Sequence, residues 1–133
     1  MRTFHLEIVT PDGPIYSGEA ESLLVHTSGG DVEILRGHAD YIAAVDIGRA
    51  RIIANGESKL ASCAGGFLSV TKGEVRLVAV TFEFAETIDV NRARAAKERA
   101  EAAIANAKDR KAGQIAEAKL ARALNRIHVS QMK

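Results

Sequence analysis

The stretch from Ile88 to Ala93 places a helix-start signal beside an arginine. Asp89 is typical of a helix N-cap, whose carboxylate accepts a hydrogen bond from a backbone N–H at the start of the helix, here that of Asn91 or Arg92. An acidic cap followed by a cation about one turn later forms half of a polar ligand site. The remaining half has to come from elsewhere in the chain.

Further arginines recur at helical spacing on both sides of one predicted turn. Arg92 and Arg99 are seven residues apart, and Arg122 and Arg126 are four apart, so each pair lies on one helix face. In an antiparallel hairpin the start of the first helix lies beside the end of the second, so the four guanidinium groups converge. The acids near them in sequence are Glu83 and Asp89.

Two interpretations of this cationic cluster stay open. Charge runs are usually solvated helix faces, which is the simpler interpretation. Bidentate arginines also suit phosphate, so the sharper hypothesis is a site for a phosphorylated small molecule or an acidic protein segment. The sequence predicts no metal site, because His5, His26, His38 and His128 lack ligand spacing, and no active site, because no nucleophile motif occurs.

The elements that position these residues change type near residue 85. The preceding part has short alternating runs separated by turn signals, which predicts an all-β sandwich over residues 1–84. Asn55-Gly56 predicts a type I′ hairpin, Lys72-Gly73 a second tight turn, and Gly65-Gly66 a turn or bulge. The expected strands begin at Phe4 and then cover 20–27, 31–35, 41–45, 49–54, 59–63, 67–71 and 75–82.

Residues 85–133 are rich in alanine at the helical period, which predicts an α-helical hairpin with its turn between Asn106 and Gly113. The expected facing stripes are Ala93, Ala96, Ala100, Ala103, Ile104 and Ala107 on the first helix, and Ile115, Ala116, Leu120, Ala123, Leu124 and Ile127 on the second. Lys97 and Glu101 are expected to pair at i,i+4. Alanine faces bury little apolar area, so we expect a hairpin only marginally more stable than an extended form.

Charge and composition exclude several classes of protein. Residues 1–84 contain seven basic and eleven acidic side chains, which give a net charge of −4. Residues 85–133 contain eleven basic and six acidic side chains, which give +5, and the two sum to the overall net charge of +1. This balance disfavours a whole-chain nucleic-acid binder and indicates a tail that meets anions. The one cysteine, Cys63, is expected to be buried in a reducing compartment, and no stretch suits a signal peptide or membrane helix, so we expect a soluble cytoplasmic protein.

Several short motifs, weak singly, agree in order and spacing with one known family. They are Phe4 to Pro14, Gly37-His38, Gly65 to Val70, Ile88 to Ala93 and Arg122 to Ile127. On these motifs the chain resembles the epsilon subunit of the bacterial F-type ATP synthase over essentially its whole length.

The resemblance implies a β-sandwich that binds the gamma subunit and the ring of c subunits within the rotating central stalk. It also implies a regulatory hairpin that folds beside the sandwich when compact. When extended, it inserts toward the catalytic alpha and beta subunits and blocks ATP hydrolysis, with Lys119, Arg122 and Arg126 facing the acidic surface of beta. Such a chain is non-catalytic and lies at the cytoplasmic face of the cell membrane, as a peripheral part of the proton-translocating complex.

In some members of this family the compact hairpin binds ATP through a motif I/L-D-x-x-R-A, which Ile88, Asp89, Arg92 and Ala93 match position for position. The resemblance therefore implies ATP as a regulatory ligand, with Mg²⁺ dependence open. The implied ATP-binding residues are Glu83, Ile88, Asp89 and Ala93 around the adenosine and Arg92, Arg99, Arg122 and Arg126 as cationic contacts. ATP bound there is a signal, because nothing in the site activates a water.

Two other functions stay open. A purely structural coupling subunit would contact its partners through the tail and bind no nucleotide. A basic helical module for nucleic acid or another anionic surface is disfavoured by the acidic first part and the lack of interleaved aromatic residues.

Overall fold

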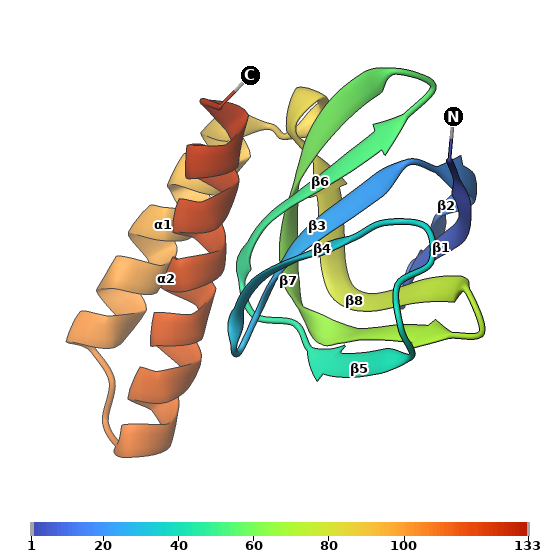
Figure 1. Cartoon of the computed structure of the whole chain (residues 1–133). Helices are drawn as coiled ribbons and strands as arrows, with labels where there is room; N and C mark the ends of the chain where they lie inside the picture. The colour runs from blue at the N-terminus through green and yellow to red at the C-terminus, as the bar shows by residue number, and fades with distance from the viewer. Residues whose placement is uncertain (1, 133) are drawn as a thin grey trace. The chain divides into compact units, whose positions relative to one another are not determined.

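The computed structural model describes residues 2–132 and divides the chain into two compact units, the first ending at Phe84 and the second beginning at Ala85 (Figure 1). The first unit is an eight-stranded β-sandwich and the second a pair of α-helices, which confirms the predicted fold class. The strands are β1 (Phe4–Thr10), β2 (Gly13–Ala20), β3 (Ser22–Thr27), β4 (Gly30–Ile34), β5 (Tyr41–Ala44), β6 (Gly48–Ala54), β7 (Glu57–Thr71) and β8 (Glu74–Phe84).

The eight strands form one folded sheet in the order β2-β1-β8-β7-β6-β3-β4, with β5 also paired to β7. Most neighbours are antiparallel, while β1 and β8 are parallel. Strand β7 is long enough to serve both layers: its first part pairs with β6 and its last part with β5. The chain therefore crosses from one layer to the other inside continuous strands, as Figure 1 shows for β7 and β8.

A glycine pair makes this crossing sterically feasible. Gly65 and Gly66 lie within β7 with φ values of 73° and 112°, a region that favours glycine. A Cβ atom at Gly66 would lie 1.9 Å from the carbonyl oxygen of Val78 on β8. The register of β7 with β8 is the same on both sides of the pair, so the pair is a bend inside the strand, and the predicted turn or bulge was wrong.

The core lies between the layers and follows the alternation of the strands. Leu6 and Ile8 on β1, Leu23 and Val25 on β3, and Leu68 on β7 are all fully buried. The predicted hairpin turns are confirmed, because Asn55-Gly56 and Lys72-Gly73 all have positive φ.

Two strand predictions were wrong. Strand β2 was missed because Pro14 signals a turn, yet proline is tolerated there since β2 lies at the edge of the sheet. The runs 59–63 and 67–71 were predicted as two strands, whereas both belong to β7. Glycine pairs usually separate strands, but here the strand bends at the pair and keeps the same register with β8 on both sides.

The second unit begins with a single 3-10 turn, η1 (Ala85–Thr87), followed by α1 (Val90–Ala105) and α2 (Arg110–Ser130). The two helices lie side by side and antiparallel, joined by a loop of residues 106–109 (Figure 1). Asp109 caps α2 by accepting a 2.7 Å hydrogen bond from the N–H of Ala112. The loop lies within the predicted range of Asn106 to Gly113, which confirms the predicted turn, and Gly113 itself belongs to α2.

Four alanines form the seam of the hairpin. Ala93 and Ala100 on α1 and Ala116 and Ala123 on α2 are all at most 3% exposed, as predicted. The predicted stripes were too wide, because their members Ala103, Ile115 and Leu124 are exposed. Helices that meet through alanine touch along a narrow line, so the flanking positions stay outside the contact. The predicted pair of Lys97 and Glu101 is present, with Nζ and Oε1 3.7 Å apart.

Candidate functional site: the arginine side of the hairpin

The start of α1 is built by Asp89. Its backbone is extended, with φ −82° and ψ 101°, and its carboxylate accepts a 3.1 Å hydrogen bond from the N–H of Arg92. The carbonyl oxygen of Asp89 accepts the N–H of Ala93 at 3.0 Å. Ile88, just before the cap, is 8% exposed and Ala93 is fully buried. The predicted N-cap is therefore confirmed, with Arg92 as its partner.

Helix geometry places the four predicted arginines on one side of the hairpin. Arg92, Arg99 and Arg122 each immediately precede a buried alanine of the seam. Two antiparallel helices are related by an approximate twofold axis perpendicular to the plane that contains both helix axes. A residue that immediately precedes a seam alanine therefore points to the same side of that plane on either helix. Arg126 follows Arg122 by four residues and lies in the same row. We call this face the arginine side.

The acidic residues of the two helices lie on the opposite side. Glu101 and Glu117 each immediately follow a buried alanine, and Glu98 follows Arg94 by four residues on that same face. Lys119 precedes Arg122 by three residues, so it extends the row of cations on the arginine side. The arginine side thus collects Lys119 and the four predicted arginines, and it contains none of the three glutamates of α1 and α2.

The cations differ in height along the hairpin. Ala93 and Ala123 each lie about a dozen residues from the connecting loop, so Arg92, Arg122 and Arg126 are at similar heights. Arg99 is two turns, or about 10 Å, closer to the loop. Arg92 and Arg99 are exposed, whereas Arg122 and Arg126 are half-buried. The arrangement suits an elongated anion with most of its charge at the α1 start.

The helix dipole adds to this positive charge. The N-terminus of α1 carries a partial positive charge, which the capping carboxylate of Asp89 partly neutralises and the nearby Arg92 reinforces. Within residues 2–132, no salt bridge involves the side chain of Arg92, Arg99 or Arg122. A bound anion would therefore relieve repulsion on this side.

The predicted acidic member Glu83 belongs to the other unit. It lies on β8, in register with Ser62 of β7, and is half-buried. The other predicted residues, from Ile88 to Arg126, all belong to the helical unit.

Neither a metal-ligand cluster nor an activated thiol occurs among residues 2–132. Among residues 2–132, no group of three or more His, Cys, Asp or Glu side chains is arranged to hold a metal ion. The thiol of Cys63 lies buried in the sandwich, where desolvation raises its pKa to about 12, so it is no nucleophile. No helix in this described part is long and apolar enough to cross a bilayer.

A second surface, on the sandwich, is apolar and exposed. Ile42 on β5, Phe67 on β7 and Val80 on β8 are 74%, 45% and 57% exposed. Ala44, Phe67 and Val78 are cross-strand partners, so the outward positions of the three strands share one face. We call it the β5–β7–β8 face; contiguous exposed apolar side chains of this kind mark protein contacts.

Sequence reasoning missed the β5–β7–β8 face, although the signal was present, since Phe67 and Val80 are apolar at outward positions of alternating strands. It grouped Lys119 with Arg122 and Arg126 among the cations of the second helix, but did not include Lys119 in the predicted anion site. The signal for that place was the spacing of three residues before Arg122.

Comparisons with known proteins agree over the whole described chain. A family model described as ATP synthase, Delta/Epsilon chain, beta-sandwich domain matches residues 3–85, and its long alpha-helix domain counterpart matches residues 86–131. The ATP synthase epsilon chain of Bacillus velezensis is 42% identical over 130 residues, which cover 98% of each chain. That of Bacillus cytotoxicus is 38% identical over 133 residues, which cover all of both chains.

Solved structures share the fold at low sequence identity. A chain of the Euglena gracilis mitochondrial ATP synthase superposes with a TM-score of 0.79 at 21% identity, covering 94% of this chain and 79% of that one. A chain of the Tetrahymena thermophila mitochondrial ATP synthase central stalk and c-ring gives 0.61 at 10% identity, covering 95% of both.

Proposed function

The chain belongs to the family of ATP synthase delta/epsilon chains, and from that membership we infer that it is a non-catalytic subunit of the rotating central stalk of a proton-translocating F-type ATP synthase. In this role it couples the catalytic head to the c-ring and lies, as a peripheral protein, at the cytoplasmic face of the cell membrane. The arginine side of the hairpin is the observation that extends this role to nucleotide sensing.

The sandwich is the docking unit in this proposal. Its β5–β7–β8 face exposes Ile42, Phe67 and Val80, which suit a permanent contact with the gamma subunit. The c-ring is the second partner of the same unit. Both contacts hold the sandwich in the rotor while the helical unit is left to change its conformation.

The hairpin is the regulatory unit. In the compact form its arginine side binds ATP, with Arg92, Arg122 and Arg126 near one height and Arg99 farther toward the loop. In the extended form the helices reach toward the alpha and beta subunits and inhibit ATP hydrolysis. The cations of α2, Lys119, Arg122 and Arg126, then meet acidic groups of beta. ATP and beta thus compete for the same cations.

ATP acts by population shift in this mechanism, because it binds one form better than the other. Ligand at ten times its dissociation constant stabilises the bound form by about 1.4 kcal/mol. A shift of this size is decisive only if the two forms are nearly balanced. The narrow alanine seam, which buries little apolar area at about 25 cal/mol per Å², supports such a balance.

The experiment is a thermal melt of the full chain, followed by helical circular dichroism at increasing ATP, with and without Mg²⁺. We expect ATP to raise the melting temperature of the parent chain and to do so far less in Arg99→Ala and Arg126→Ala. The matched controls are Arg94→Ala and Arg110→Ala, which remove an exposed arginine away from the arginine side. These two should respond to ATP as the parent does.

The outcomes separate the sensor from a purely structural coupling subunit. If ATP does not change the melting temperature of the parent chain, the ATP-sensor proposal is overturned and the structural coupling role remains. An equal loss of the ATP-induced rise in melting temperature in all four variants would mean that ATP binding depends on the net charge of the chain alone. Salt-dependent binding of DNA or RNA by the parent chain would instead favour a nucleic-acid module.

A further inference from the structure

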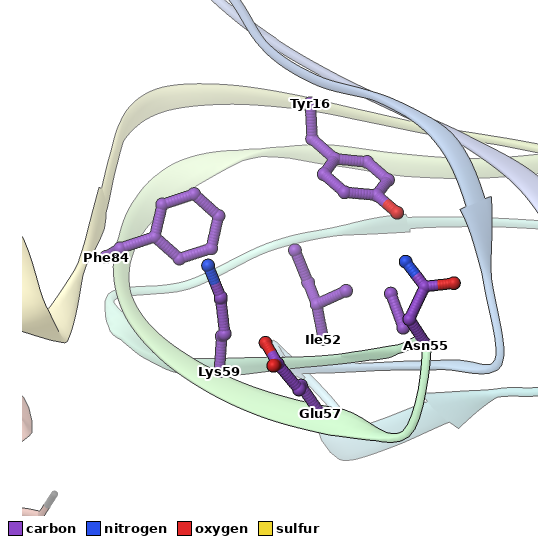
Figure 2. Close-up of a pocket in the computed structure, with 7 residues that line it drawn as sticks. Tyr16, Ile52, Asn55, Glu57, Lys59 and Phe84 are labelled. Carbon is purple, nitrogen blue, oxygen red and sulfur yellow. The ribbon is translucent and has the colours of Figure 1, made fainter.

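The sandwich contains a cavity whose lining cation already has a partner. This cavity, of about 240 Å³, is lined by residues of β2, β6, β7 and β8 and of the β6–β7 turn (Figure 2). Lys59 is the basic residue of its lining. Figure 2 shows Lys59 beside Phe84, and its ammonium lies 5.7 Å from the centroid of that ring. A cation that can receive an anionic ligand is found instead on the helical unit.

Lys119 of α2 lies beside the seam on the arginine side of the hairpin. It follows the buried Ala116 by three residues and precedes the buried Ala123 by four. It therefore lies nearer to the partner helix than Arg122, which immediately precedes Ala123. The equivalent position on α1 is Ala96, whose small side chain cannot cover the ammonium of Lys119. Lys119 is accordingly exposed.

Lys119 and Arg99 lie at nearly the same height on opposite helices. Ala93 and Ala123 mark one level of the seam, as described above. Lys119 is four residues, or about 6 Å, closer to the connecting loop than Ala123. Arg99 is six residues, or about 9 Å, closer to the loop than Ala93. The two cations thus differ by about 3 Å along the helix axes, and we call them the loop-side pair.

No acidic side chain of the helices neutralises the loop-side pair. Glu98, Glu101 and Glu117 all lie on the opposite side of the hairpin. Over the described range 2–132, neither Lys119 nor Arg99 takes part in a salt bridge. Two cations at one height with no acid between them repel each other, and an anion placed between them would be attracted by both.

We propose that Lys119 is a fifth phosphate-binding cation of the hairpin and that, together with Arg99, it holds the terminal phosphate of a nucleoside triphosphate. This inference rests on the proposed binding of ATP at the arginine side. The arginines near the start of α1 then hold the phosphates closer to the adenosine. The loop-side pair lies one to two turns farther along, where a triphosphate reaches and a diphosphate does not. The Lys119 ammonium donates charge-assisted hydrogen bonds to the phosphate oxygens.

The test measures the affinity of the full chain for ATP and for ADP by isothermal titration calorimetry at one salt concentration. Lys119→Met keeps a good helix former at an exposed position, so the variant should fold. We expect it to weaken ATP binding about tenfold and ADP binding less than about twofold. Lys119→Arg keeps the charge and should bind ATP within about threefold of the parent chain.

Lys97→Met is the matched control. Lys97 is four residues beyond Ala93, at the height of Lys119, but it pairs with Glu101 on the opposite side. It removes the same charge, so an effect of net charge alone would appear in both variants, whereas we expect less than about a twofold change in ATP affinity. Circular dichroism of each variant reports whether the helices are intact.

The outcomes distinguish this inference from the sensor proposal on which it rests. If Lys119→Met and Lys97→Met weaken ATP equally, or if Lys119→Met weakens ADP as much as ATP, the role of Lys119 is overturned and ATP sensing remains. A parent chain that binds no ATP overturns both proposals.

Discussion

The carboxylate of Asp89 accepts the backbone N–H of Arg92 at 3.1 Å, so one hydrogen bond both caps α1 and fixes the backbone that carries the first cation of the arginine side. Asp89→Ala should therefore lower the free energy of unfolding of the helical unit by about 1 kcal/mol. It should also reduce the rise in melting temperature that ATP produces. Asp109→Ala removes the corresponding cap of α2 and should destabilise similarly, while the ATP response remains. An ATP response equal in both variants would contradict a special role for Asp89.

Gly66 is the residue whose replacement should damage the sandwich most. A methyl group there would lie 1.9 Å from the carbonyl oxygen of Val78, on a backbone with φ of 112°. We expect Gly66→Ala to cost about 3 kcal/mol or more of unfolding free energy, measured by urea denaturation. Gly56→Ala is the control. The φ of Gly56 is also positive, at 75°, but apart from its chain neighbours no heavy atom lies within 4 Å of an added Cβ. We therefore expect this substitution to cost only about 1 kcal/mol of unfolding free energy. Similar costs at the two positions would refute the steric argument.

Cys63 should make the protein less stable at alkaline pH. Burial raises its pKa from 9.0 to about 12, so above pH 9 the unfolded chain loses the thiol proton while the folded chain keeps it. The stability that this difference provides is fully present below pH 9 and is lost between pH 9 and about 12, at up to about 1.4 kcal/mol per pH unit. Urea denaturation across this range should show a shallower decline in Cys63→Ala. Parallel declines would mean that other groups, such as lysines, account for the whole effect.

The ion pair between Arg49 and Asp31, 3.1 Å long, should contribute little to stability. Both side chains are more than a third exposed, and Asp31 also accepts from His26 Nδ1 at 2.9 Å. A double-mutant cycle of Arg49→Ala and Asp31→Ala should give a coupling energy below about 1 kcal/mol. Raising the salt concentration should reduce it further. A coupling of several kcal/mol would show that this strand face is less hydrated than its exposure indicates.

Ile115 and Leu124 should matter for inhibition and not for folding. They are 49% and 43% exposed, so Ile115→Gln and Leu124→Gln should each change the unfolding free energy by less than about 0.5 kcal/mol. If the extended helices meet the alpha and beta subunits, the same substitutions should weaken the inhibition of ATP hydrolysis in the assembled enzyme. Unchanged inhibition in both variants would remove these residues from the contact.

The fold was predictable from the sequence wherever a residue has a strong local preference for one conformation. Asn55-Gly56 and Asp89 each carry a strong local preference, and the structure has the predicted turn and cap at these positions. The predictions failed where tertiary context decides the outcome. Pro14 is compatible with a strand only because β2 lies at the sheet edge. At Gly66, β8 approaches β7 so closely that a side chain would not fit, so this glycine lies within a continuous strand and does not end it.

The candidate site likewise has a part that local sequence predicted and a part that depends on how the two helices pack. The helical spacing of Arg92, Arg99, Arg122 and Arg126 predicted a cluster from periodicity alone. That all four share one side, and that the helix glutamates lie on the other, depends on which alanines form the seam. The predicted stripes included Ile115 and Leu124, so they did not define the seam narrowly enough to separate the two sides. Binding of ATP at this cluster stays a prediction.

The course of β7 and β8 through both layers has a mechanical consequence. A pull on β5 reaches β6 along the covalent backbone of β7, without passing through side-chain contacts between the layers. Sliding of one layer over the other would break the ladder that joins β7 to β8 on both sides of Gly65-Gly66. The unit is thus stiff against shear, a property that the proposed docking of the sandwich on the c-ring and the gamma subunit would require.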